Sequence, residues 1–81
     1  MKERYENGLV TSTAMAARQS IASELRETRL GLQMTQQTLA DRAGTKKSNI
    51  SRMESGNYNP SLDFLVKVAE SMGKKIDIHV N

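Results

Sequence analysis

The chain has 81 residues, a length that fits one small domain burying about 60% of the surface its unfolded form exposes. Twelve Lys and Arg against nine Asp and Glu give a net charge of +3, and the absence of Cys excludes disulfides, thiol catalysis and Cys-based zinc sites. The polar start, KERYENG, is unlike a secretory signal, and no apolar run approaches the about 20 residues of a membrane span, so we expect a cytoplasmic protein.

Residues 1–12 are predicted to form a flexible N-terminal arm, because they combine mixed charges with an Asn7-Gly8 turn signal and little periodicity. A first helix is expected to begin near residues 11–13, where each residue can cap a helix N-terminus. Gly31 is expected to mark its end. Residues at three- and four-position spacing predict its buried stripe, namely Ala14, Ala17, Ile21, Leu25, Thr28 and Leu32.

Two short helices are predicted next, over about residues 36–43 and 46–55. Thr35 is a suitable cap for the first of them, and Gly44 can adopt the left-handed conformation that ends it. Thr45 is the expected cap of the second, which stops near Ser55-Gly56. From residue 42 to residue 52 there are four basic residues and no acidic one, so the positive charge is concentrated on this helix pair.

A fourth helix is predicted after the loop GNYNP, with Ser61 as its cap and Gly73 just past its end. Its expected apolar stripe is Leu62, Leu65, Val66, Ala69 and Met72. The tail, residues 74–81, changes to a period of two, which predicts a short C-terminal β-strand with Ile76, Ile78 and Val80 on one side. A single strand has no partner within a helical domain, so it pairs with another chain or stays frayed.

The two short helices and their Gly turn predict a helix-turn-helix, which places its second helix in the DNA major groove. The run TQQTLADRAG, followed by NIS, Glu54, Gly56 and PSL, resembles the Cro and phage-repressor, or XRE, family. Asn49 stands where a Ser is common, and Thr45 replaces the usual apolar residue. The resemblance implies an all-α, four- to five-helix, lambda-repressor-like DNA-binding domain over residues 13–73.

The resemblance also assigns roles to individual residues. Base contacts are expected from the exposed side of the second short helix, at Lys47, Ser48, Ser51 and Arg52. Phosphate contacts are expected from Gln36, Lys46 and Asn57. Either lysine can bind a guanine edge or a phosphate, and any one of these side chains can instead be part of a solvated face. Arg29 and Glu54 resemble the family's partly buried ion pair and are expected to be structural.

No enzyme is predicted. The single His, His79, has no Ser or carboxylate constellation near it in sequence, and no catalytic residue, metal site or cofactor is indicated.

The expected function is therefore a sequence-specific regulator that binds a double-stranded DNA operator as a homodimer and represses transcription. The tail resembles that of HigA-like antitoxins, which implies a RelE- or HigB-like toxin as a partner. The alternative is a protein-interaction adaptor that keeps the fold and does not bind DNA.

Overall fold

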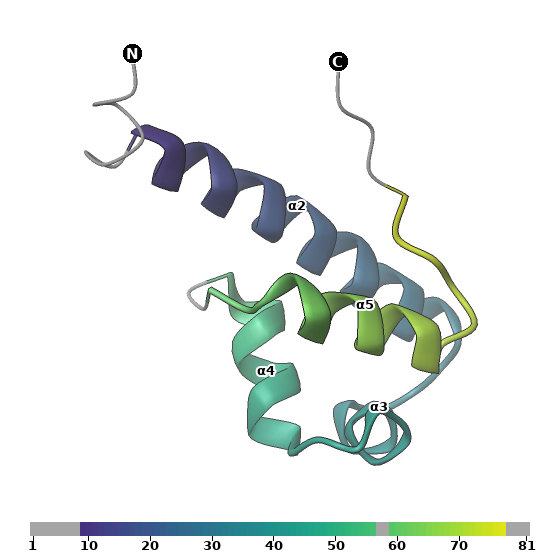
Figure 1. The fold of residues 1–81 in the computed structure, drawn as a ribbon. Coiled ribbons are helices and arrows are strands. Elements are labelled where there is room, and N and C mark those ends of the chain that lie inside the picture. Colours follow the sequence, from purple (N-terminus) through teal and green to yellow (C-terminus); the bar gives the residue numbers. More distant parts are fainter. Residues whose placement is uncertain (1–8, 57–58, 78–81) are drawn as a thin grey trace.

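The computed structural model describes residues 9–56 and 59–77, and these ranges contain four helices (Figure 1). They are α2 (Leu9–Gly31), α3 (Gln36–Ala43), α4 (Lys47–Ser55) and α5 (Leu62–Ser71). The predicted all-α class is therefore correct for this part of the chain. None of these helices has the length and apolar character needed to cross a membrane.

The first helix, α2, begins earlier than the sequence predicted. It starts at Leu9, so residues 9–12, which were assigned to the N-terminal arm, are helical. The remainder of that arm, residues 1–8, lies outside the described residues. The helix ends at Gly31 as expected.

The turn after α2 is closed by Gln33, the only described non-glycine residue with a positive φ, at 59°. The Gln33 N–H donates to the Leu30 carbonyl at 3.0 Å, and the Met34 N–H donates to the Arg29 carbonyl at 3.1 Å. This pair of bonds is the Schellman arrangement, which normally places a glycine at the left-handed position. Gly31 therefore ends the helix, while the strained conformation falls two residues later.

The predicted caps of α3 and α5 are correct. The Thr35 hydroxyl accepts from the Thr38 N–H, the Ser61 hydroxyl accepts from the Phe64 N–H, and Gly44 has a φ of 69°. The predicted cap of α4 is wrong, because Lys46 occupies that position and supplies no side-chain hydrogen bond.

Thr45 has another role, in the turn between α3 and α4. Its N–H donates to the Ala40 carbonyl at 2.9 Å, so the residue still belongs to the end of α3. Its hydroxyl accepts from Asn49 Nδ2, also at 2.9 Å.

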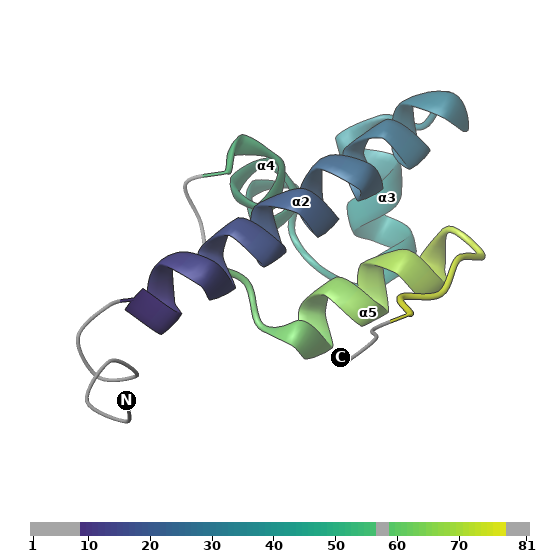
Figure 2. The same cartoon turned by 90° about the horizontal axis from the view of Figure 1, so that it is seen from above.

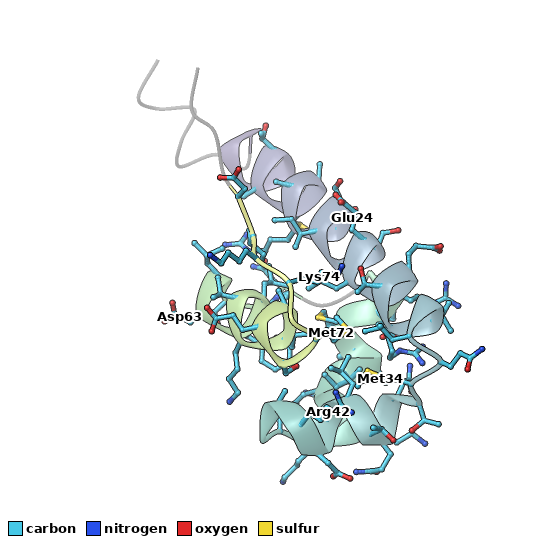
Figure 3. The ribbon with its side chains drawn as sticks, turned by 90° about the vertical axis from the view of Figure 1, so that its right-hand side faces the viewer. Glu24, Met34, Arg42, Asp63, Met72 and Lys74 are labelled. Carbon is cyan, nitrogen blue, oxygen red and sulfur yellow. The ribbon has the colours of Figure 1, made fainter. Side chains whose placement is uncertain are left out.

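The core lies between the four helices, and each of them contributes to it. Figure 3 shows two of its members, Met34 and Met72, in the interior. Its buried apolar residues are Ala22, Leu25, Met34, Leu39, Ala40, Ala43, Ile50, Met53, Leu65, Val68, Ala69 and Met72. Burial of this surface stabilises the domain by about 25 cal/mol per Å² of apolar area.

Three members of the predicted stripes, Ala17, Leu32 and Leu62, are exposed. Leu32 is 47% exposed because the helix has already ended at Gly31, and Leu62 is equally exposed as the first residue of α5. Val68, which the stripe omitted, is fully buried.

The predicted C-terminal strand is not confirmed. Residues 74–77 form no regular structure, and Ile78 and Val80 lie outside the described residues. The described segment runs beside α2 (Figure 1) and lines a groove with Ile21 and Leu25. Ile76 is half-buried and packs against the core of its own chain. A strand needs a ladder partner, and residues 9–56 and 59–77 contain no other strand that could pair with this segment.

We expect Gln33→Gly to stabilise the domain by about 0.5–1 kcal/mol, because glycine removes the left-handed strain while making the unfolded chain more flexible. Chemical denaturation measures the change. Gly44→Ala, at a φ of 69°, is the matched control and should destabilise by about 1 kcal/mol. A loss of stability in Gln33→Gly would show that the Gln33 side chain contributes more than its backbone strain costs.

Candidate nucleic-acid interface

One side of α4 presents the predicted base-reading residues to solvent. Lys47, Ser48, Ser51 and Arg52 are all exposed. The opposite side carries Ile50 and Met53, which are 0% and 1% exposed in the core. Residues three and four apart share a side of a helix, as Lys47 does with Ser51, and Ser48 with Ser51 and Arg52. Burial of the apolar side therefore turns these four polar residues outward together.

The N-terminal end of α4 is arranged differently from the sequence prediction. Lys46 is exposed at the cap position and has an extended backbone, with no side-chain cap bond. Asn49 is held back by its bond to Thr45, which leaves Lys47 and Ser48 as the outward-facing residues of the first turn.

Arg29 and Glu54 form the ion pair that the sequence placed between the first and third predicted helices. Arg29 Nε donates to Glu54 Oε2 at 2.7 Å, and Arg29 Nη2 donates to Glu54 Oε1 at 3.0 Å. Their side chains are 9% and 3% exposed. The remaining terminal nitrogen of Arg29, Nη1, donates to the Met34 carbonyl at 2.6 Å. This bidentate geometry with further hydrogen bonding is the condition under which a buried pair is tolerated.

Gln36 joins the same carboxylate from the start of α3. Its Nε2 donates to Glu54 Oε1 at 3.0 Å, so one residue of α4 is bonded to both α2 and α3. The sequence assigned Gln36 to a phosphate and did not foresee this internal bond. No rule of sequence spacing predicts a contact between positions 36 and 54, because the two residues belong to different helices, α3 and α4.

Two further residues near this network were missed by the sequence reasoning. Gln19 Nε2 on α2 donates to the Gly56 carbonyl at 2.7 Å, and Arg26 Nε lies 3.9 Å from Glu54 Oε1. The three-residue spacing between Arg26 and Arg29 was the available signal, because it places both on one face of a helix.

The other predicted contacts are not placed. Asn57, Ile78 and Val80 lie outside the described residues. Within residues 9–56 and 59–77, no group of three or more His, Cys, Asp or Glu side chains is positioned to hold a metal ion.

Removal of one partner of the buried pair should destabilise strongly. We expect Glu54→Gln or Arg29→Met to cost about 3–5 kcal/mol, because each leaves one buried charge uncompensated. The double variant should lose less than the sum of the two, and urea denaturation of all four proteins measures the coupling. Strict additivity would mean that the two charges do not depend on each other.

Comparison with known proteins gives a consistent family. The matching family model, HTH_3, is described as Helix-turn-helix and covers residues 25–79. An uncharacterized HTH-type transcriptional regulator of Archaeoglobus fulgidus is 38% identical over 55 residues, which are 68% of this chain and 78% of the relative. Another, of Methanothermobacter thermautotrophicus, is 37% identical over 51 residues, 63% of this chain and 74% of the relative. No solved structure gives a significant match. Because the family model covers more than half of the sequence, the chain belongs to the XRE-type helix-turn-helix family.

Proposed function

We propose that this chain is a sequence-specific transcriptional regulator that binds double-stranded DNA by placing α4 in the major groove. The observation that carries the proposal is the exposed face of α4, where Lys47, Ser48, Ser51 and Arg52 lie together. The only acidic residue of α4, Glu54, has a 3% exposed side chain and is paired with Arg29. The outward face of α4 therefore carries the positive charges of Lys47 and Arg52 and no negative charge, which suits a polyanionic partner.

The roles of the individual residues follow from their positions. Arg52 and Lys47 are proposed to donate to guanine edges, with Ser48 and Ser51 contacting neighbouring bases. Lys46, exposed at the start of α4, and Asn57, in the loop after it, are assigned to phosphates.

Gln36 is assigned to a phosphate through the start of α3. The backbone N–H groups of Gln36 and Gln37 have no partner among the described residues, since the first bonds of this helix come from Thr38 and Leu39. A helix N-terminus with such donors favours an anion.

A dimer is proposed as the functional unit, with two copies of α4 about 34 Å apart on an inverted repeat. A small core of this kind also gains stability from a second subunit. We propose repression as the outcome, because a dimer that covers operator DNA excludes other proteins from it.

The antitoxin role is a finer proposal that depends on the alternating pattern of Ile76, Ile78 and Val80. Its test is co-purification of the chain with the product of the adjacent gene. If that product is not a small RelE- or HigB-like toxin, the antitoxin role is wrong and the DNA-binding role is unaffected.

The alternative, an adaptor without DNA binding, gives no reason for three exposed cations on and before α4, at Lys46, Lys47 and Arg52. Binding to duplexes as a function of salt separates the two functions.

We expect the wild-type chain to bind duplex DNA with a log–log salt slope of about −0.9 per phosphate neutralised. Operators selected from a random pool supply the preferred sequence.

Arg52→Ala should weaken the free energy of binding to that sequence by about 1–3 kcal/mol and relax the preference at one base pair. A uniform loss across all duplexes would make Arg52 a phosphate contact instead. No binding of the wild type at low salt would favour the adaptor.

Deletion of residues 78–81 should weaken dimerisation while leaving the helical content unchanged, because it removes Ile78 and Val80 of the proposed pairing segment and leaves Ile76 on the core. Light scattering coupled to gel filtration measures the assembly, and circular dichroism measures the helices. His79→Ser is the control, since it keeps the three apolar residues of the tail. Unchanged assembly in the deletion variant would assign the dimer interface to the helices.

A further inference from the structure

A second arginine, Arg26, lies near the Glu54 carboxylate but forms no hydrogen bond with it. Arg26 lies one turn before Arg29 on α2, and its only recorded contact is the 3.9 Å approach of its Nε to Glu54 Oε1. Both oxygens of Glu54 already accept hydrogen bonds from Arg29. The Arg26 side chain is 49% exposed, whereas that of Arg29 is 9% exposed. Two guanidinium groups therefore face one carboxylate, and the excess positive charge is on the exposed one.

Arg26 lies in an open groove between α2 and the last turn of α4. The groove has a volume of about 450 Å³. Gln19 joins its two walls by donating to the Gly56 carbonyl. The one acidic side chain of the groove, Glu54, is nearly inaccessible and is neutralised by Arg29, so the groove is positively charged. Its polar lining comes from Gln19, Ser23, Arg26, Glu54, Ser55 and Gly56.

The groove lies beside the proposed DNA-reading face. Gln36 bonds to the same oxygen of Glu54 that Arg26 approaches, so Arg26 is on the side of the domain where α3 begins. At its other end the groove reaches Gly56, which directly precedes Asn57. Arg26 therefore lies between Gln36, a proposed phosphate contact, and Gly56 at the end of α4. In the view of Figure 2, α4 and α5 lie on opposite sides of α2, and no residue of α5 lines this groove.

We propose that Arg26 binds a phosphodiester of the DNA backbone at the edge of the major groove that α4 occupies. A guanidinium group donates two parallel hydrogen bonds to phosphate oxygens, and Arg26 has its donors available within the described structure. The contact adds affinity on every sequence and no base preference. The inference rests on the proposed DNA binding by α4, and it adds the first helix to the interface.

Arg26→Gln tests the contact, with Lys67→Gln as the matched control. Lys67 is exposed on α5, which does not line the groove, and its replacement removes the same charge. Affinity for the selected operator and for an unrelated duplex is measured between low and high salt. Arg26→Gln should reduce the salt slope by about 0.9 and weaken both complexes about eightfold at 0.1 M salt. Lys67→Gln should leave the slope unchanged.

Arg26→Lys separates binding from folding, because a lysine also neutralises a phosphate and should restore the slope. If Arg26 is only a second counter-ion for Glu54, Arg26→Gln lowers the Tm and leaves the slope equal to that of Lys67→Gln, which overturns the inference. If the wild-type chain binds no duplex, the proposed function itself fails. These outcomes are distinguishable because the wild type, the control and both Arg26 variants are measured on the same two duplexes.

Discussion

The Glu54 carboxylate is the point at which three helices are joined by side-chain hydrogen bonds, and its burial constrains the rest of the domain. A carboxylate taken out of water is costly unless its oxygens are bonded and its charge is compensated. Arg29 supplies the charge from α2, and Gln36 adds an amide from α3. The described part of the structure has no buried side-chain polar atom without a partner. Because each of these bonds is directional, α4 has one favourable orientation relative to the other two helices.

Apolar packing supplies the stability that the directional bonds do not. Helices of eight and nine residues, such as α3 and α4, are marginal in water by themselves. They persist here because Leu39, Ile50 and Met53 are almost fully removed from solvent. The same burial decides what is left outside, since a helix with its apolar side in the core has its polar side on the surface. The proposed DNA-reading face is thus a consequence of the packing behind it.

The features that sequence reasoning located correctly are mostly local. A hydroxyl cap such as Thr35 or Ser61 acts over three residues, and a left-handed glycine such as Gly44 acts over the turn it closes. The predicted cap at Thr45 was wrong because the end of α3 bonds its N–H, a competition that the order of residues does not reveal. The outward position of Leu32 has a similar cause, since an apolar period does not specify the residue at which a helix stops. Contacts that cross elements, such as Gln36 with Glu54, follow from helix crossing and have no signature in spacing.

The different burial of the charged residues shows why net charge is a weak guide to an interface. Arg26 and Arg29 are both arginines on adjacent turns of α2. The side chain of Arg29 is buried with Glu54, whereas that of Arg26 is about half exposed. Because it is buried, Arg29 has a structural role, and its positive charge is compensated by Glu54. Burial of this pair also removes the only negative charge of α4 from the surface, so the remaining cations of that helix act without a competing carboxylate. A chain with a net charge of only +3 thereby has a helix face with positive charges and no negative one, because the acidic residue of that helix is buried rather than absent.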